Sequence, residues 1–278
     1  MQGKNGLTLT LLLTLALTWP AIAQTSRRES ANSYLERGNQ WLRRGELDRA
    51  IEDFSFALSF DATLDRAWQN RGMARERHGD TEGALADYSR ALQVNPRNLE
   101  ALLNRGILYI RRGDYGNALR DLDEAVTRNP RDVRAWVNRG VAHHYSGDYE
   151  AALADYSRAI RIDARDAVIW AARGDVRLQM NDTDGALRDC QEALRLDSRK
   201  VTALHTTGSV WLRKGDLARA LAHFDQAVAL SPREAFLLCS RGMAHLRMNQ
   251  QEAAARDFGA CRALGGQLPP EAERFMRR

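Results

Sequence analysis

Residues 99–132 read LEALLNRGILYIRRGDYGNALRDLDEAVTRNPRD, and the spacing of this stretch recurs along the chain. Gly106 has a counterpart every thirty-four residues, at Gly38, Gly72, Gly140, Gly174, Gly208 and Gly242. Alanine follows each glycine twelve residues later, at Ala50, Ala84, Ala118, Ala152, Ala186, Ala220 and Ala254. A strict period of this length predicts stacked units, each too small to bury its own apolar face. It favours an extended binding surface over an active site.

Each unit is predicted to be a helix, a sharp turn and a second helix. When the recurring glycine is numbered position 8, position 15 carries only glycine or asparagine: Gly45, Gly79, Gly113, Gly147, Asn181, Gly215 and Asn249. These residues tolerate the left-handed backbone that ends a helix. Asp or Glu follows the turn in most units, where it meets the positive end of the next helix dipole. Proline at position 32 ends the second helix in three units, at Pro96, Pro130 and Pro232.

The recurring small residues predict close packing of the two helices, with Gly at position 8 against Ala at position 20. Larger apolar residues surround this contact. Position 4 is aromatic or leucine, and position 24 is mostly aromatic, as at Phe54, Tyr88, Tyr156, Phe224 and Phe258.

This pattern, with alanine at position 27, resembles the tetratricopeptide repeat. The resemblance covers residues 31–266 as seven repeats that start near 31, 65, 99, 133, 167, 201 and 235. It implies an all-α, right-handed superhelical solenoid of antiparallel helix pairs. Gly265-Gly266 and Pro269-Pro270 interrupt the helical pattern after the last repeat. Residues 267–278 are expected to be a C-terminal cap segment in which Glu271 to Arg278 form a short helix and Phe275 and Met276 cover the last repeat.

The N-terminus is interpreted as a secretory signal peptide over residues 1–23, followed by a polar lead-in over residues 24–30. Lys4 precedes an apolar run over residues 7–19, and Ala21-Ile22-Ala23 is a small-x-small cleavage signature. The run is shorter than the about 20 residues that a membrane-spanning helix needs. We therefore expect an exported protein, periplasmic or secreted, without stable membrane insertion after cleavage. An uncleaved anchor is the alternative.

The charge balance does not indicate a nucleic-acid partner. The chain has 41 Lys and Arg against 36 Asp and Glu, and the arginines are spread over every repeat instead of forming one basic tract. Among the three cysteines, Cys190 and Cys261 occupy core positions and are expected to be buried. A disulfide between Cys239 and Cys261 is not expected, because positions 5 and 27 of the repeat are predicted to face different neighbours.

Two charged rows predict a salt bridge inside each repeat. Position 7 is arginine in six repeats and position 23 is aspartate in the same six, while the sixth repeat replaces both, with Thr207 and His223. The joint loss favours pairing within a repeat, for example Arg105 with Asp121, over pairing between repeats.

Position 6 supplies the predicted binding site. Asn70, Asn104 and Asn138 resemble the asparagine ladder in the repeat domain of O-linked N-acetylglucosamine transferase. An Asn amide both donates and accepts, so it can bind the backbone of an extended peptide whatever its side chains are. Neighbouring positions of the predicted groove combine arginines with apolar residues such as Leu103 and Val137, and this mixture suits a peptide with acidic and apolar residues. The arginines are Arg66, Arg77, Arg111 and Arg134.

Other functions find no support in the motifs. Position 5 is never Lys and position 6 is never Arg, so the carboxylate clamp that holds chaperone tails in some members of this family is absent. Nucleotide-binding loops, zinc-protease motifs and nucleophile elbows are also absent. We therefore expect a non-catalytic, protein-binding scaffold without cofactor or metal. The alternatives are a self-associating structural protein and an accessory subunit of an envelope assembly.

Overall fold

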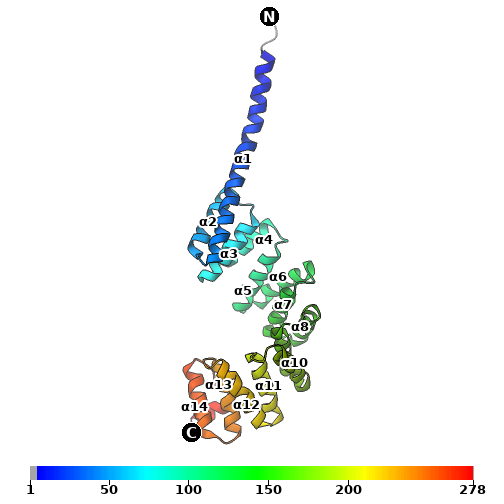
Figure 1. The fold of residues 1–278 in the computed structure, drawn as a ribbon, viewed down its shortest axis with the longest axis vertical. Helices are drawn as coiled ribbons and strands as arrows, with labels where there is room; N and C mark the ends of the chain where they lie inside the picture. The colour runs from blue at the N-terminus through cyan, green and yellow to red at the C-terminus, as the bar shows by residue number, and fades with distance from the viewer. Residues whose placement is uncertain (1–4, 278) are drawn as a thin grey trace. The chain divides into compact units, whose positions relative to one another are not determined.

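The computed structural model describes residues 5–277, with side chains from residue 25 onward. Over these residues the fold is all-α, with fifteen helices arranged as successive antiparallel pairs (Figure 1). The chain forms two compact units, and the boundary lies between Asn129 and Pro130. Residues 1–4 of the predicted signal peptide and the last residue of the predicted cap, Arg278, lie outside the described part.

The first unit contains three helix pairs. Its helices are α1 (Asn5–Arg44), α2 (Leu47–Phe60), α3 (Asp65–His78), α4 (Thr81–Val94), α5 (Leu99–Arg111) and α6 (Tyr115–Arg128). Helix α1 runs without interruption through the predicted signal peptide and lead-in into the first repeat, and its N-terminal half extends past α2 and α3 (Figure 1). Cleavage before Gln24 stays a prediction. Among the described residues, no helix combines the length and apolarity that crossing a membrane requires.

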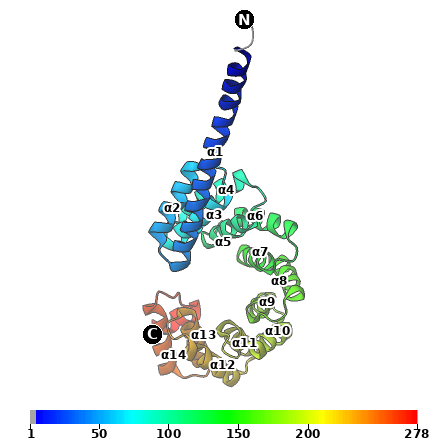
Figure 2. The same ribbon diagram turned by 45° about the horizontal axis from the view of Figure 1, so that its top comes forward.

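The second unit contains four helix pairs and a short last helix (Figure 2). Its helices are α7 (Val133–Ser146), α8 (Tyr149–Ile162), α9 (Ala167–Gln179), α10 (Thr183–Leu196), α11 (Val201–Lys214), α12 (Leu217–Leu230), α13 (Ala235–Arg247), α14 (Gln251–Ala263) and α15 (Pro270–Met276). Helix α15 packs on the seventh repeat, where the Phe275 ring lies 6.1 Å from the Phe258 ring and Ala272 is fully buried.

The turns at position 15 have the predicted left-handed backbone in all seven repeats. The φ angle is positive at the five glycines and also at Asn181 (65°) and Asn249 (60°). The aspartate that follows the turn then caps the next helix. For example, the Asp114 carboxylate accepts from the Asn117 backbone N–H, and Asp182 accepts from Gly185 in the same way.

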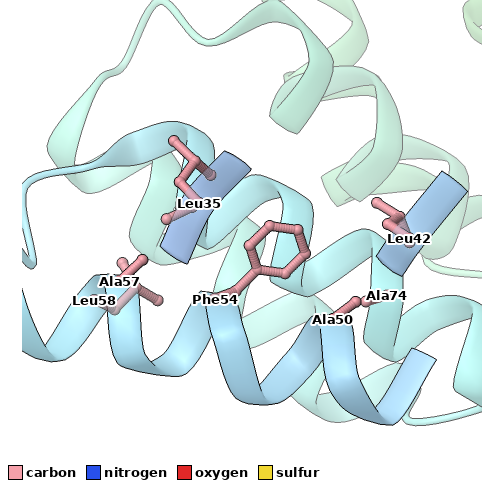
Figure 3. Packing of buried hydrophobic residues seen from close by; sticks show 8 residues of the cluster. Leu35, Leu42, Ala50, Phe54, Ala57, Leu58 and Ala74 are labelled. Atoms are coloured by element: carbon pink, nitrogen blue, oxygen red, sulfur yellow. The ribbon is translucent and has the colours of Figure 1, made fainter. Parts of the chain in front are cut away.

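The recurring glycine makes room for the side chain at position 24, which the sequence alone did not indicate. A Cβ atom on Gly38 would lie 2.7 Å from the Phe54 ring, and one on Gly72 would lie 2.8 Å from the Tyr88 ring. Figure 3 shows Phe54 between the helices, surrounded by apolar residues of the first two repeats. Position 20 contributes through its backbone, since the Ala84 carbonyl oxygen would lie 3.3 Å from the same Gly72 Cβ.

The predicted salt bridge is present in all six repeats that carry the pair. In each, the guanidinium at position 7 donates to both oxygens of a buried aspartate at position 23, over 2.6–2.9 Å. The pairing of positions 7 and 23 is thus within each repeat, as predicted, and some of these arginines make a further bond to the preceding repeat. Arg71 also donates to the Ser55 hydroxyl of the preceding repeat at 3.0 Å, and Arg105 donates to Ser89 at 2.9 Å. The third guanidinium nitrogen is free for this bond because the aspartate occupies only two.

The prediction that Cys239 and Cys261 do not form a disulfide is wrong. Cys239 on α13 and Cys261 on α14 form a disulfide, with their Cα atoms 5.6 Å apart. The antiparallel register that places position 24 over position 8 also places position 27 beside position 5, three residues along each helix in opposite directions. Cys190 is buried and free, as expected, and burial raises the pKa of its thiol to about 12.

Candidate functional site

The candidate site lies on one face of the first helix of each pair. Positions 2, 5, 6, 9, 12 and 13 share this face because they follow the helical repeat; we call it the first-helix face. In the first unit it belongs to α1, α3 and α5, and in the second to α7, α9, α11 and α13. Successive first helices pack side by side within each unit, for instance α1 with α3 and α9 with α11. Side chains from neighbouring repeats therefore meet on this face.

Asn70 on α3 takes part in a chain of side-chain amides. Its Nδ2 donates to Asn39 Oδ1 on α1 at 2.7 Å, and its Oδ1 accepts from Gln69 Nε2 at 3.2 Å. A primary amide has a second N–H and a second lone pair, so Asn70 keeps one donor and one acceptor for a ligand. Asn104 occupies the same position on α5 and is partly exposed. Asn39, at position 9, is a member of this site that the sequence interpretation did not include.

The three predicted arginines of the first unit differ in their surroundings. Arg66 and Arg77 are exposed. Arg111 donates to Glu76 Oε1 at 2.7 Å, and the Tyr88 hydroxyl donates to the other Glu76 oxygen at 3.0 Å. Burial, followed by the nearby Glu76 carboxylate, raises the pKa of Tyr88. Much of the Arg111 charge is therefore balanced within the protein, whereas the Arg66 and Arg77 side chains are exposed.

The remaining predicted residues belong to the second unit. Asn138 on α7 is partly exposed on the first-helix face. Arg134 lies at the start of the same helix, where its side chain donates to the Asp132 carboxylate at 2.8 Å. Asp132 also accepts from the Arg134 backbone N–H at 2.9 Å. This arginine is thus tied to the cap of its own helix.

The second unit has further polar residues on this face that the sequence interpretation did not include. Asp175 Oδ2 on α9 lies 3.6 Å from His144 Nε2 on α7, and Thr206 Oγ1 on α11 lies 3.5 Å from Asp175 Oδ1. His205 Nε2 hydrogen-bonds Ser240 Oγ on α13 at 2.9 Å. The sequence contains a sign of Asp175 as a site residue, because position 9 is aspartate in the fifth repeat and Met, Ile or Val in most other repeats.

The described residues of this face do not gather into a metal-binding cluster. Within residues 25–277, no group of three or more His, Cys, Asp or Glu side chains is placed to hold a metal ion. The chemistry that the face offers is hydrogen bonding by amides and ionic contact by exposed side chains. Such a surface can hold a polypeptide.

Comparison with models of protein families shows the family to which this chain belongs. The family model described as "Tetratricopeptide repeat" matches residues 70–119, 103–167 and 171–235, together more than half of the chain. The chain belongs to the tetratricopeptide repeat family. Proteins with this repeat are typically scaffolds for protein–protein interaction. A comparison with curated protein sequences gives no significant match.

Several solved structures share the fold, two of which are described as tetratricopeptide repeat proteins. One from Parabacteroides merdae ATCC 43184 is 21% identical, with a TM-score of 0.73, over 90% of this chain and 98% of that one. Pseudomonas aeruginosa pilF is 20% identical, with a TM-score of 0.64, over 74% and 94%. YrrB, described as "a TPR protein with an unusual peptide-binding site", is 22% identical, with a TM-score of 0.58, over 66% and 95%. At these identities the likeness extends to the fold alone.

Proposed function

We propose that this tetratricopeptide repeat protein is a non-catalytic scaffold that holds an extended peptide segment of a partner on its first-helix face. The observation that carries the proposal is the contact between Asn70 and Asn39. It brings amides of successive repeats together and leaves Asn70 one donor and one acceptor. A peptide backbone in extended form presents the same two groups at each residue. The peptide-binding site named for YrrB supports this reading of the fold.

The residues that we assign to the peptide are Asn70, Asn104, Asn138, Arg66, Arg77, Arg111 and Arg134. The amides bind the peptide backbone, and the exposed guanidinium groups of Arg66 and Arg77 favour acidic side chains. Arg111 and Arg134 contribute less charge, because Glu76 and Asp132 already neutralise them. The expected ligand of the first unit is therefore a peptide with acidic and apolar residues.

We further propose that the protein works in an exported compartment, the periplasm or the cell exterior. The signal-like residues 1–23 are one support. The disulfide between Cys239 and Cys261 is an independent one, because disulfides persist in oxidising compartments and are rare in the cytosol. Fractionation of expressing cells, followed by N-terminal sequencing, tests both points. We expect a periplasmic or secreted protein that begins at Gln24, and a cytosolic full-length chain would contradict the proposal.

The binding test uses a triple variant in which Asn70, Asn104 and Asn138 become Ala. Wild type and variant are immobilised, exposed to envelope extract, and the retained proteins are compared. We expect the variant to lose the partner while its circular dichroism and unfolding midpoint stay near those of wild type. Retention of the same partner by a folded triple variant would refute the proposed site.

Self-association is a second candidate, and one observation favours it. Val168 and Phe236 on the first-helix face of the second unit are apolar side chains that are 47% and 46% exposed. Light scattering during size-exclusion chromatography distinguishes the candidates. A dimer that becomes monomeric on the double change Val168→Ser and Phe236→Ser would favour self-association over peptide binding by this unit.

A further inference from the structure

We propose that Asp175 on α9 is a subsite for a cationic side chain, lysine or arginine, of a peptide bound to the second unit. This inference rests on the proposed function and gives its second unit a ligand of different chemistry from that of the first. It starts from the residue's place on the first-helix face. Asp175 stands at position 9 and contacts Thr206 at position 6 of the next repeat. In the first unit, the same two positions are neutral amides, Asn39 and Asn70.

The protein's own contacts leave the Asp175 carboxylate largely unsatisfied. Thr206 Oγ1 and His144 Nε2 lie 3.5 Å and 3.6 Å from its oxygens, whereas good hydrogen bonds to a carboxylate are about 2.7–2.9 Å long. Among the described residues, His144 is the one basic side chain with a nitrogen within 4.0 Å of this carboxylate. An ionised carboxylate can accept about four hydrogen bonds. Asp175 therefore has capacity for a donor from outside.

Asp189 of the same repeat is a carboxylate whose hydrogen-bonding capacity is filled by the protein, and it serves as a comparison for Asp175. It accepts from Arg173 at 2.9 Å and 2.7 Å and lies 2.9 Å from Arg177 Nη1, and its side chain is 2% exposed. The Asp175 side chain is 32% exposed. Asp189 therefore links two helices, whereas the Asp175 carboxylate is accessible to a ligand.

Exposed apolar side chains on the same first-helix face of the second unit specify the rest of the ligand. Val168 lies seven residues before it on α9, hence on the same helix face, and is 47% exposed. Phe236 on α13 is 46% exposed and packs edge-on against His205 of α11 at 5.0 Å. Asp175 is the one acidic residue at the first-helix-face positions of α7, α9, α11 and α13. A basic side chain next to apolar side chains fits this pattern, because a charge pair is stronger where apolar groups exclude water.

The test is selection of peptides from a library of random dodecapeptides displayed on phage, using the full chain as purified from expressing cells. Three proteins are compared: wild type, Asp175→Asn and Glu192→Gln. Asp175→Asn removes the charge but keeps the size of the side chain. Glu192 on α10 is the matched control, since its side chain is also 32% exposed and lies on the second helix of the same repeat.

We expect wild type and Glu192→Gln to enrich peptides with Lys or Arg next to aliphatic or aromatic residues. A synthetic peptide of this kind should bind Asp175→Asn at least about tenfold more weakly, as expected for loss of a charge-assisted hydrogen bond. Replacing its basic residue by norleucine should weaken binding to wild type but have little further effect on Asp175→Asn. Such non-additivity indicates direct contact, and a merely structural role for Asp175 would not produce it.

Two results would overturn the subsite: enriched peptides without basic residues, or equal loss on norleucine replacement in wild type and Asp175→Asn. Both leave peptide binding itself intact. A third result, no peptide enriched on any of the three proteins, would contradict the proposed function and the subsite with it. The failure of the inference and the failure of the proposed function are thus distinguishable.

Discussion

The guanidinium of Arg173 donates to both carboxylate oxygens of Asp189, at 2.9 Å and 2.7 Å, and so joins the two helices of the fifth repeat. Arg173 Nη1 also donates to Ser157 of the preceding repeat at 3.1 Å. One arginine thereby links two helices of its own repeat and a helix of the repeat before it. The row of arginines at position 7 is therefore part of the solenoid's internal structure.

The change Asp189→Asn should therefore destabilise the protein strongly. It leaves the guanidinium groups of Arg173 and Arg177 partly buried without their counter-charge, and breaking such a pair costs about 3–5 kcal/mol. Replacing the pair by apolar residues, Arg173→Met with Asp189→Leu, should cost less because no charge is stranded. Urea unfolding followed by circular dichroism measures both. A loss in the single variant no larger than in the double variant would contradict the prediction.

Two glycines of the seventh repeat should respond oppositely to alanine. A Cβ on Gly242 would lie 2.6 Å from the buried Phe258 ring, whereas one on Gly259 would meet nothing within 4 Å. Gly259→Ala should stabilise α14 by about 1 kcal/mol through helix propensity. Gly242→Ala should destabilise, because overpacking costs about 1–3 kcal/mol and outweighs the propensity gain. Urea midpoints of the two variants check the signs, and a shift in the same direction for both would refute the argument.

Thiol labelling should find one buried free cysteine. With Cys239 and Cys261 in a disulfide and Cys190 buried, iodoacetamide should modify no cysteine in the native protein. It should modify one cysteine in denatured, unreduced protein and three after reduction. Mass spectrometry counts the labels. Three labels without reductant would show that the disulfide is absent.

Removal of that disulfide should lower stability. The bond closes a loop with a sequence separation of 22 residues, and loss of such a cross-link is expected to cost about 3 kcal/mol. The double change Cys239→Ala and Cys261→Ala should therefore lower the urea midpoint, and dithiothreitol should lower that of wild type but not that of the variant. An equal effect of dithiothreitol on both proteins would contradict this account.

Stability should fall as the pH drops through the range in which histidine titrates. Burial lowers the pKa of His205 and of His223. The unfolded chain then binds protons at about pH 6.5, before the folded chain does, so acid favours unfolding. The stability that these histidines contribute is complete above that pH and is lost below it. Urea unfolding should give a lower free energy of unfolding at pH 5.5 than at pH 7.5. The change His205→Gln should make this difference smaller. An unchanged difference in the variant would exclude His205 as a source of the pH dependence.

The sequence predicted the fold in detail because most of its determinants are local. The left-handed turns at Gly113 and Asn181 follow from residue type. The pairing of Arg105 with Asp121 follows from two rows of opposite charge that share one period. Asn70, Asn104 and Asn138 could each be placed at the same position of the first helix of its repeat, but their role in binding stays a prediction. The contact of Asn70 with Asn39 could not be predicted from the sequence, because it joins different repeats.

The sequence by itself determined the helix pairs, their turns and their number, since these depend on residue type and spacing within each repeat. The tertiary structure alone decided that Cys239 meets Cys261 and that Asp175 faces His144 and Thr206. Such contacts depend on the antiparallel register of two helices and on the stacking of one repeat against the next. Both are fixed by how side chains fill the space between helices, and a one-dimensional period does not contain that information.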